Sequence, residues 1–364
     1  MADNVTSFSL DELNIYFQSR RAGLNAQLVS HLVEFIDATE ASLDCAIYDL
    51  RHPDVLDALA RLAQSGKQLR IAFDGGQEHS GGLTADPKPG GTEQALQHAG
   101  LLDYATPVHH TGRHLMHDKF LVRDGQFTWT GSANFTIGGL ELQDNHCLVA
   151  ASPELAVVYT ATFEDLLQSN HHHTKLSAQN SILVPNTMVT LGDIALTPFF
   201  APASGEDIEQ AIIDALTGAQ KVRMMAFLIS DSGILDALAT FANDPDVDIS
   251  GVYDPNGMKD VLRYTKQNPS KFWFMHDPRF VAAPSHAFDP NREQNFMHNK
   301  TMIIDDHLVL TGSYNFSENA EANDENFIMI DSSLVAAAFT AYFDALYAEY
   351  ASTAVMSVDV IDVM

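Results

Sequence analysis

Hydrophobic and polar residues along the chain follow two periodicities in turn, one typical of helices and one typical of strands. Apolar residues fall at helical spacing in 25–38 and alternate in 43–47, which predicts a helix followed by a strand. Pro53 suits the first turn of a second helix that Gly66 can end, and the apolar run 69–73 predicts the next strand. The first half therefore predicts the order helix, strand, helix, strand, followed by a hairpin-like region and a final helix.

The second half of the chain repeats this order about 180 residues later. The residues 56–60 recur as 235–239, and Asp74, which closes one predicted strand, corresponds to Asp254, which closes another. The corresponding elements are expected at Asp207–Leu216, Val222–Leu228, Ser232–Phe241 and Val247–Tyr253. Strands that alternate with helices favour an α/β fold with largely parallel, buried sheets. The repeat therefore predicts two pseudo-symmetric α/β sandwich lobes with largely parallel central sheets.

The repeat also sets the expected domain boundaries. We expect the first lobe at 1–170, a connecting segment at 171–198 and the second lobe, with a tail, at 199–364. The connecting segment lacks the periodicity of the lobes, and its three histidines, 171–173, are expected to be exposed rather than to bind a metal. The last residues, 353–364, fit either a frayed tail or an extra strand.

Composition and charge exclude several classes of protein. Hydrophobic residues make up 46% of the 364, which is ordinary for a globular chain and excludes a disordered one. No long apolar run and no secretion signal are apparent, so we expect a cytoplasmic protein without a transmembrane segment. Cys45 and Cys147 lie in apolar, strand-like runs and are expected to be buried thiols. The formal charge of −28 opposes loose binding to polyphosphate backbones and to anionic bilayers, and whether it reflects a saline environment stays open.

One polar motif occurs twice, at the repeat distance. The first copy is His117-Asp118-Lys119, then Asp124, then Gly131-Ser132-Ala133-Asn134. The second copy is His298-Asn299-Lys300, then Asp305, then Gly312-Ser313-Tyr314-Asn315. In both copies four residues separate the lysine from the aspartate and six separate the aspartate from the glycine. Identical spacing in two copies makes a chance occurrence negligible.

The spacing of the motif indicates how its side chains meet. Histidine and lysine are two residues apart at the start of an apolar run, so they project to the same face of a strand. A turn at the aspartate reverses the chain, and the return strand brings Gly-Ser-x-Asn beside them. Two such halves, face to face, would place two imidazoles, two ammonium groups and two amides around one anion. This set suits phosphodiester cleavage without a metal: one neutral imidazole attacks phosphorus to form a phosphohistidine, and the other, protonated, donates to the leaving oxygen.

The duplicated pattern His-x-Lys-(x)4-Asp-(x)6-Gly-Ser-x-Asn resembles that of the phospholipase D superfamily, over about residues 24–350. The resemblance implies two α/β lobes, one active site at their interface, for which a monomer suffices, and no metal or cofactor. It assigns the nucleophile and general-acid roles to His117 and His298, with the nucleophile, by family habit, at His117; which histidine attacks is left open. The residues that would hold the phosphate are Lys119, Lys300, Asn134 and Asn315.

The resemblance also implies one acidic residue downstream of each motif that orients a histidine. Glu325 fits this role in the second half, and Asp144 is the aligned residue in the first. The remaining motif residues are expected to have structural roles: Asp124, Asp305, Gly131, Ser132, Gly312 and Ser313. The serines are not expected to be nucleophiles, because no Gly-x-Ser-x-Gly turn surrounds them. No Cys/His spacing and no His-Glu-x-x-His pattern predicts a metal site.

The sequence leaves the phosphodiester substrate open. The run from Asn315 to Ser317, leading to Glu325, resembles the nuclease-like and mitochondrial-type branch of the superfamily. Basic residues near the motifs could form a groove for nucleic acid; the candidates are Arg113, Lys119, Arg123, Arg279, Arg292 and Lys300. Lipid access would instead require an exposed apolar rim, for which the candidates are Phe280, Val281, Phe288 and Phe296. We expect a phospholipase D-type hydrolase that cleaves a phospholipid headgroup or transfers it to an alcohol, with a nuclease as the alternative and a non-catalytic phosphate-binding protein as a third possibility. The oligomeric state stays open.

Overall fold

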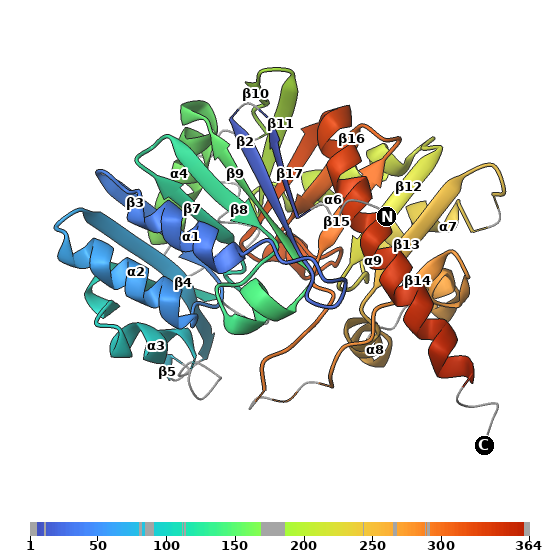
Figure 1. The fold of residues 1–364 in the computed structure, drawn as a ribbon, viewed down its shortest axis with the longest axis horizontal. Helices are drawn as coiled ribbons and strands as arrows, with labels where there is room; N and C mark the ends of the chain where they lie inside the picture. The colour runs from blue at the N-terminus through green and yellow to red at the C-terminus, as the bar shows by residue number, and fades with distance from the viewer. Residues whose placement is uncertain are drawn as a thin grey trace.

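The computed structural model of the chain contains two large β-sheets with helices between and outside them (Figure 1). It describes residues 6–10, 12–79, 82–83, 91–110, 112, 114–168, 186–242, 244–264, 268–287, 289 and 292–359. The histidine run 171–173, Arg113 and Phe288 lie outside these residues. Within them, no helix combines the length and the apolar character that crossing a bilayer requires.

The first half of the chain forms a nine-stranded sheet. Its strands are β1 (Ser7–Leu10), β2 (Leu13–Gln18), β3 (Ser42–Ile47), β4 (Gln68–His79), β5 (Gly82–Leu83), β6 (Ala105–His110), β7 (Lys119–Arg123), β8 (Phe127–Gly131) and β9 (Asn145–Ala151). They are joined in the order β1-β2-β9-β8-β7-β3-β4-β5, and β6 also pairs with β4. The pairs β3–β4 and β4–β6 are parallel, and the other pairs among the described strands are antiparallel.

The second half forms an eight-stranded sheet of the same design. Its strands are β10 (Val189–Leu191), β11 (Ile194–Ala201), β12 (Lys221–Ala226), β13 (Asp248–Tyr253), β14 (Phe280–Ala282), β15 (Lys300–Ile304), β16 (Leu308–Gly312) and β17 (Glu325–Asp331). Their order, β10-β11-β17-β16-β15-β12-β13-β14, repeats that of the first sheet, with β14 in the position of β6. Here β12–β13 and β13–β14 are parallel, and the other described pairs are antiparallel.

Helices pack on both faces of the two sheets. The α-helices are α1 (Leu28–Asp37), α2 (Pro53–Gln64), α3 (Thr92–His98), α4 (Pro153–Gln168), α6 (Gly205–Leu216), α7 (Ser232–Ala239), α8 (Pro255–Tyr264) and α9 (Ser333–Asp359). The short helices are η1 (Leu102–Tyr104), η3 (Pro269–His276) and η4 (Ala320–Ala322), which are 3₁₀ helices, and η2 (Gly138–Leu142), which is a π-helix. The predicted helices at 25–38 and 207–216 are confirmed as α1 and α6, and Pro53 begins α2 as expected.

The predicted fold class, two pseudo-symmetric α/β lobes, is confirmed, but both sheets are mixed rather than largely parallel. The units β3-α2-β4 and β12-α7-β13 do give the parallel pairs that alternating helices and strands predict. Each motif then forms an antiparallel hairpin, and further antiparallel strands extend the sheet beyond it. Because helices cover both faces, these antiparallel strands are largely buried and contain short apolar runs. Such runs are also typical of buried parallel strands, so the sequence did not distinguish the two.

Three hydrophobic cores hold these layers together. The first lies between the first sheet and α1 and α2; it contains Cys45 and Cys147 as free thiols, as predicted. The second lies between the second sheet and α6 and α7, and includes Ile212. The third lies between the two sheets and includes Tyr159 of α4 and Phe339 of α9, with strand residues from both halves. Because this central core draws on both halves of the chain, the two lobes are packed against each other over a buried, apolar junction.

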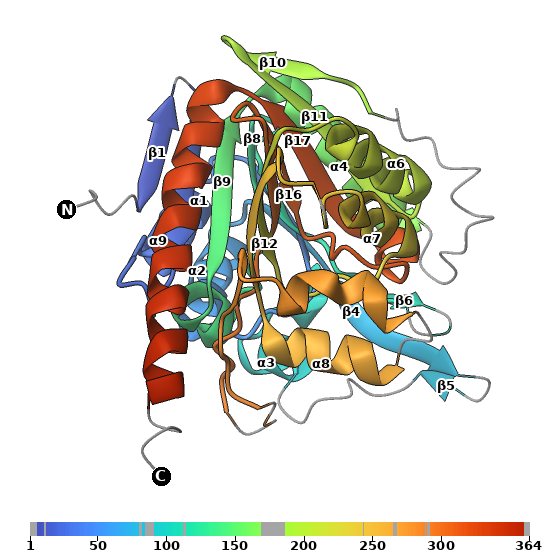
Figure 2. The same ribbon diagram turned by 90° about the vertical axis from the view of Figure 1, so that its right-hand side faces the viewer.

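Helix α9 belongs to the second half but is anchored to the first (Figure 2). The Tyr342 hydroxyl donates to the Gln18 carbonyl oxygen at 2.8 Å and accepts a hydrogen bond from the Asn299 side-chain amide at 3.0 Å. The ring of Phe17 stacks on Tyr342, with the ring centroids 4.9 Å apart, and meets Phe339 edge-on at 5.0 Å. The helix therefore closes the junction between the lobes.

The second sheet begins earlier in the chain than the sequence indicated. Strand β10 and most of β11 fall in 171–198, the range expected to connect the lobes. Proline is rare inside sheets, so Pro198 argued against a strand in this part of the sequence. In the structure Pro198 nevertheless lies in the middle of β11, where it pairs with Ile328 of β17. At the other end, α9 continues to Asp359, so the described part of the 353–364 tail is helical and not an extra strand.

We expect Tyr342→Phe to lower the free energy of unfolding by about 1–3 kcal/mol, because it leaves the Asn299 amide and the Gln18 carbonyl each short of one buried hydrogen bond. Denaturant unfolding followed by circular dichroism measures the change. Tyr347→Phe is the matched control on the same helix, since its hydroxyl makes a 3.5 Å contact to Pro278 at the surface. An equal loss in both variants would contradict the anchoring role of Tyr342.

Candidate active site

Each copy of the motif lies on an antiparallel hairpin whose first strand begins at the motif lysine. Lys119 begins β7 and Lys300 begins β15, and the return strands β8 and β16 end at the motif glycines. At the turn of the first hairpin, the Asp124 carboxylate accepts hydrogen bonds from three backbone N–H groups of 40–42. Asp305 accepts two, from 220 and 221, at the turn of the second. These bonds tie each hairpin to the neighbouring strand.

The motif glycines allow the return strand to approach the next strand closely. Gly131 and Gly312 have φ of 151° and 148°, a region that other residues rarely adopt. A Cβ at either position would collide with a backbone carbonyl oxygen, that of His146 or that of Asn326. Glycine is therefore needed for β8 and β16 to deliver the following Ser-x-Asn segment into the site.

Two repeated aspartates hold the residue that precedes each motif histidine. Asp74 accepts the N–H of Met116 at 3.0 Å, and Asp254 accepts the N–H of Met297 at 3.1 Å. Asp74 lies within β4 and Asp254 follows directly after β13, the corresponding positions that the sequence repeat singled out. Their role is to position the chain that enters the site.

The backbone of each motif histidine is bound by the opposite lobe. The His117 N–H donates to the Asp324 carbonyl oxygen at 2.8 Å, and the His298 N–H donates to the Asp144 carbonyl oxygen at 3.0 Å. The two contacts are related by the pseudo-symmetry of the lobes. These contacts place each motif histidine at the junction between the lobes.

The side chain of His117 is held by a buried carboxylate of the second lobe. Its Nδ1 lies 2.7 Å from Oε2 of Glu325, which is fully buried. Ser313 donates its hydroxyl to the same oxygen at 2.6 Å, and Asn323 donates to Oε1 at 2.9 Å. Burial raises the pKa of Glu325 to about 8, against the opposing effects of Lys119 and of these hydrogen bonds. The carboxylate is thus fixed in one orientation toward the imidazole.

The side chain of His298 is held by an amide of the first lobe instead. Its Nδ1 lies 3.1 Å from Oδ1 of Asn145 and 3.1 Å from the backbone oxygen of Ser132. The Ser132 hydroxyl donates to the same Asn145 oxygen at 2.8 Å, just as Ser313 does to Glu325. Both acceptors place the His298 proton on Nδ1 and leave Nε2 available to a ligand.

The expected orienting role of Asp144 is therefore wrong by one residue. Gly131 pairs with Cys147 while Gly312 pairs with Phe327, so the first lobe has one more residue between the hairpin and the next strand. The extra residue lies where the first lobe has the π-helix η2 and the second lobe has the 3₁₀ helix η4. Counting residues from the motif cannot reveal where such an insertion falls, and it made Asp144 the apparent equivalent of Glu325.

The Asp144 side chain has a structural setting of its own. Its carboxylate accepts hydrogen bonds from the hydroxyls of Ser19 and Tyr350 and pairs with the Arg21 guanidinium at 2.6 Å. The carboxylate is fully buried, and Arg21 is 18% exposed. Asp144 therefore joins the start of the chain to α9 at the edge of the junction.

The two motif lysines are buried, and their ammonium groups act on each other. Lys119 Nζ donates to the His117 carbonyl at 2.7 Å and lies over the ring of Tyr48; Lys300 Nζ donates to the His298 carbonyl at 2.5 Å and lies over the ring of Phe227. Burial lowers the pKa of Lys119 to about 8, although Glu325 opposes the shift. Burial also lowers the pKa of Lys300 well below its usual value, and the charge of Lys119 lowers it further.

The electrostatics of His298 indicate that the motif residues share one site. Burial lowers its pKa well below the usual range, and the charges of Lys300, Lys119 and His117 lower it further. Two of these charges come from the opposite lobe. A site with two buried ammonium groups and two imidazoles favours an anion, because an anion would neutralise the repulsion among them.

The motif asparagines retain unused hydrogen-bonding capacity. Asn134 and Asn315 follow directly after β8 and β16, and the side-chain oxygen of each is buried without a hydrogen-bond partner among the described residues. This oxygen is an acceptor, whereas a phosphate oxygen requires the NH₂ donor of the same amide. The phosphate-holding role of the two asparagines therefore stays a prediction.

Several residues expected near the substrate lie elsewhere. Arg123 stacks on the rings of Phe35 and Phe127, and Arg279 pairs with Asp277 at 2.8 Å. Phe280, a candidate for the apolar rim, is buried in the second core. Val281 and Phe296, the other described candidates, are half-buried.

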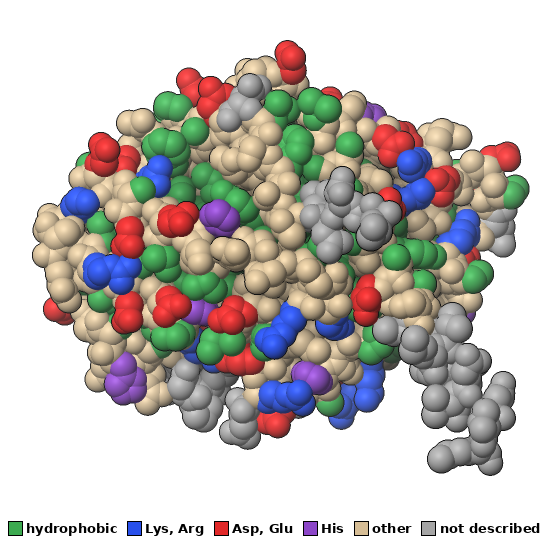
Figure 3. Space-filling model, viewed as in Figure 1, with side chains coloured by type: hydrophobic (Ala, Val, Ile, Leu, Met, Phe, Trp, Pro, Cys, Tyr) green, Lys and Arg blue, Asp and Glu red, His purple; other side chains and the backbone are tan. Residues whose placement is uncertain are grey.

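Beside the junction lies a group of four basic side chains, of which the sequence analysis named Arg292 and missed the other three. Arg20, Arg21, His286 and Arg292 line a pocket of about 410 Å³, together with Glu293. Basic side chains gather at the lower edge of the face in Figure 3. Arg21 binds Asp144, whose carbonyl holds His298, so the pocket adjoins the site. These residues are far from the motifs in sequence, except Arg292, and only the folded chain brings them together.

Comparisons with known proteins agree with this arrangement. The family model of the phospholipase D-like domain of cardiolipin synthase matches the chain twice, at 32–167 and at 210–347. The mitochondrial cardiolipin hydrolase of Drosophila melanogaster is 27% identical over 157 residues, which are 37% of this chain and 57% of that protein. That of Xenopus laevis is 31% identical over 85 residues, which are 20% of this chain and 40% of that protein. The chain thus spans about half the length of the curated relatives it matches.

A solved structure has the same fold over nearly the whole chain. The phosphatidylserine synthase of Haemophilus influenzae Rd KW20 superposes with a TM-score of 0.65 at 14% identity, covering 95% of this chain and 88% of that one. At this identity the likeness concerns the fold, and it includes both lobes.

We expect Glu325→Gln and Asp144→Asn to have different effects, because only Glu325 contacts a motif histidine side chain. Glu325→Gln should lower kcat/KM for a model phosphodiester by about 10–100-fold, with little loss of stability. Asp144→Asn should change kcat/KM by less than about threefold but lower the free energy of unfolding by about 2 kcal/mol, since Arg21 loses its charged partner. Steady-state kinetics and denaturant unfolding on both variants measure this, and a larger kinetic loss in Asp144→Asn would contradict the assignment.

Proposed function

This chain belongs to the family of phospholipase D-like domains represented by cardiolipin synthase, and we propose on that basis that it cleaves or transfers a phosphodiester through a covalent phosphohistidine. The observation that carries the proposal is the exchange of orienting groups across the junction. Glu325 of the second lobe holds His117 of the first, and Asn145 of the first lobe holds His298 of the second. Two imidazoles with fixed Nδ1 positions can then act on one phosphorus atom.

We assign the nucleophile role to His117. Its Nε2 lone pair attacks phosphorus, and the bond to the leaving oxygen breaks as the P–N bond forms. The imidazole gains positive charge in this step, and the Glu325 carboxylate, 2.7 Å from Nδ1, stabilises that charge. His298 has an amide in the corresponding position and no such stabilisation of its cation.

His298 is then the general acid and, later, the general base. The phosphodiester anion supports its protonated form, which gives its proton to the leaving oxygen. The neutral ring next takes a proton from water or from an alcohol, whose oxygen attacks phosphorus and displaces His117. Because its cation lacks a carboxylate partner, the His298 imidazolium is a stronger acid than a carboxylate-paired one would be.

The motif lysines and asparagines hold the non-bridging oxygens of the phosphate. Lys119 and Lys300 contribute charge from the two lobes, and Asn134 and Asn315 contribute their NH₂ groups as donors. Donors fixed before the reaction stabilise the charge that develops on these oxygens. No step of this sequence is assigned to a metal.

For the substrate we propose an anionic phospholipid. The charge of −28 opposes nonspecific binding to nucleic acid and to an anionic bilayer alike, so either substrate has to be recognised by a local basic site. The basic pocket of Arg20, Arg21, His286 and Arg292 is compact and adjoins the site, so it suits a second phosphate or a carboxylate of a lipid headgroup. The curated relatives are named as cardiolipin hydrolases, a name that fits a substrate with two phosphates. A nuclease is the second candidate, because the same pocket suits a neighbouring phosphate of a strand.

Vesicles and DNA offered to the same preparation separate the two candidates. We expect the protein in EDTA, well below its melting temperature, to release headgroups from cardiolipin or phosphatidylglycerol vesicles without nicking single-stranded DNA. His117→Ala and His298→Ala should each abolish release, and rapid quench should trap an acid-labile, base-stable phosphoenzyme in the native protein. DNA nicking without headgroup release would favour the nuclease. Activity on neither substrate and no phosphoenzyme would indicate a protein that only binds phosphate.

We expect kcat/KM to depend on pH as a bell-shaped curve. The Lys119 ammonium has a pKa of about 8 in the free enzyme, so its charge is present below pH 8 and is lost as the pH rises through it. Anion binding, and with it kcat/KM, should therefore fall above about pH 8. The acid limb reports the coupled titration of the histidine pair and Glu325, because burial raises the pKa of Glu325 to about 8 and its carboxylate form is the one that supports the His117 cation. A flat profile between about pH 5 and 9 would contradict the two-histidine scheme.

A further inference from the structure

Three carboxylates from separate elements of the second lobe converge outside the active site. Glu209 lies on α6, Asp231 is the residue that caps the N-terminus of α7, and Glu321 lies on η4. One oxygen atom of each lies within 4.8 Å of the others. Asp231 is fully buried, whereas Glu209 and Glu321 are half-buried. The cluster is therefore within reach of a solute from the surface.

The charges that act most strongly on this cluster are negative. Burial raises the pKa of Glu209, and Asp231, Glu321 and Glu318 raise it further. Gly233, in the first turn of α7, has no side chain, and a Cβ there would collide with the Glu209 carboxylate. The glycine thus lets the Glu209 carboxylate lie against the helix end that Asp231 caps, despite the repulsion between the two.

One buried polar atom at this place lacks a partner among the described residues. Asp231 accepts the N–H of Ile234 with Oδ1 at 2.9 Å, and a side-chain hydrogen bond to Asp231 contributes to the raised pKa of Glu209. The Tyr314 hydroxyl is buried without a partner; burial raises its pKa, and the charges of Asp231, Glu321 and Glu209 raise it further. Tyr314 is not part of the acidic cluster, so its unmatched hydroxyl is an independent sign that a ligand is missing there.

The first lobe fills the same place with a different set of side chains. His52 corresponds to Asp231, because both donate their N–H to the phenylalanine that follows the motif, Phe135 or Phe316. Glu141 corresponds to Glu321, since each lies four residues before the orienting residue, Asn145 or Glu325. The His52 ring lies 2.9 Å from the Glu141 carboxylate, so this carboxylate has an imidazole as its partner where the second lobe has a second carboxylate.

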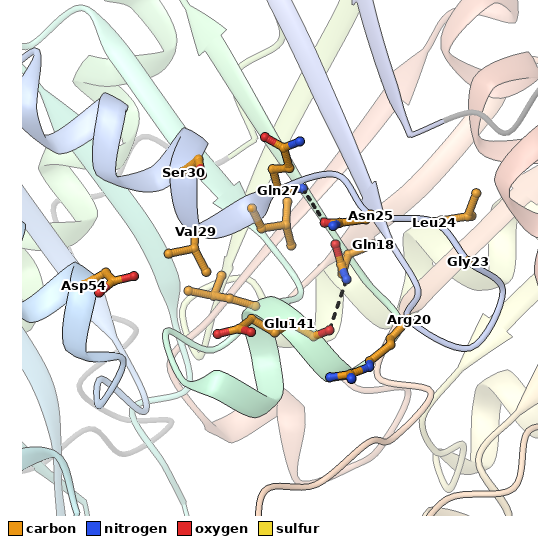
Figure 4. Close-up of a pocket in the computed structure, with 12 residues that line it drawn as sticks. Gln18, Arg20, Gly23, Leu24, Asn25, Gln27, Val29, Ser30, Asp54 and Glu141 are labelled. Atoms are coloured by element: carbon orange, nitrogen blue, oxygen red, sulfur yellow. Dashed lines mark hydrogen bonds between the residues drawn. The ribbon is translucent and has the colours of Figure 1, made fainter.

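The third position of the cluster also differs between the lobes. Val29 of α1 corresponds to Glu209 of α6, as the buried residues Leu28 and Ile208 show. Figure 4 shows Val29 and Glu141 lining one pocket of the first lobe. The second lobe therefore replaces a histidine and a valine by two carboxylates, at a position where the first lobe needs no further ion.

We propose that Glu209, Asp231 and Glu321 bind a divalent cation, with calcium preferred over magnesium. Three oxygens within 4.8 Å of one another can all reach a Ca²⁺ ion at its usual distance of about 2.3–2.6 Å. Mg²⁺ requires about 2.0–2.1 Å, a regular octahedron and the loss of tightly held water, which suits a cluster assembled from three separate elements less well. Water supplies the remaining ligands, one of them within reach of the Tyr314 hydroxyl.

The cation would join α6, α7 and η4 directly behind the second motif. The Asp231 N–H donates to the Phe316 carbonyl oxygen at 3.1 Å, and Tyr314 lies between the motif residues Ser313 and Asn315. Helix η4 leads into Asn323, which holds Glu325. The ion therefore stabilises the segment that positions the orienting carboxylate and takes no part in the reaction at the histidines.

Thermal unfolding of the full chain with added metal tests the proposal independently of activity. Protein treated with EDTA and dialysed is titrated with CaCl₂ or MgCl₂ at constant ionic strength. Saturating calcium should raise Tm by about 5 °C, and magnesium by less, because the ion binds the folded state only. Glu209→Gln and Asp231→Asn should lose most of this rise, and asparagine keeps the helix cap. Isothermal titration should show the corresponding loss of one calcium site.

Two further variants keep the test decisive. Asp214→Asn removes an exposed carboxylate from the same helix, α6, and should respond to calcium as the native protein does. Asp231→His reproduces the His52–Glu141 pair of the first lobe and should raise the Tm of the metal-free protein while abolishing the calcium response. The proposal is overturned if calcium gives no rise in the native protein, or if Glu209→Gln or Asp231→His responds as Asp214→Asn does.

Discussion

The structure depends on the burial of two lysine ammonium groups at one junction. Burial lowers the pKa of both, and Glu325 is the carboxylate that acts on both of them. Removing two like charges from water costs several kcal/mol each, even after relaxation of the protein. The apolar core that the two sheets share with α4 and α9 is what can offset this cost. An anion between the two ammonium groups would supply the negative charge that they lack. The repulsion between the buried ammonium groups in the free site therefore favours an anionic ligand.

Sequence spacing predicted the parts of this site that depend on local geometry. The two-residue period of a strand places His117 and Lys119 on one face, and the hairpin brings back Asn134. Spacing failed where a single insertion changes the register, as at Asp144 and Asn145. It also could not reveal contacts between distant segments: Arg21 and Arg292 share a pocket although 271 positions separate them in the numbering. Strand direction failed because buried parallel and antiparallel strands have the same apolar composition.

The two lobes have the same backbone arrangement, but the side chains that orient their motif histidines differ. The hairpins, the glycines at β8 and β16 and the aspartates before each motif are duplicated. The orienting groups are not, since one lobe offers Asn145 and the other Glu325. Because a phosphohistidine mechanism needs one ring that gains charge and one ring that gives up a proton, unequal orienting groups suit it better than equal ones.

Under the proposed mechanism, this divergence makes the two lobes complementary rather than interchangeable. The orienting group of each histidine comes from the opposite lobe, so a pair of first lobes would place Asn145 beside both rings. No carboxylate would then stabilise the imidazole that attacks phosphorus in that mechanism. A pair of second lobes would place Glu325 beside both rings, so the two rings would have equal orienting groups. One histidine with a carboxylate partner and one with an amide partner occur together only at the junction of the two different lobes. Helix α9 holds the two lobes together there, through the hydrogen bond from Tyr342 to Gln18.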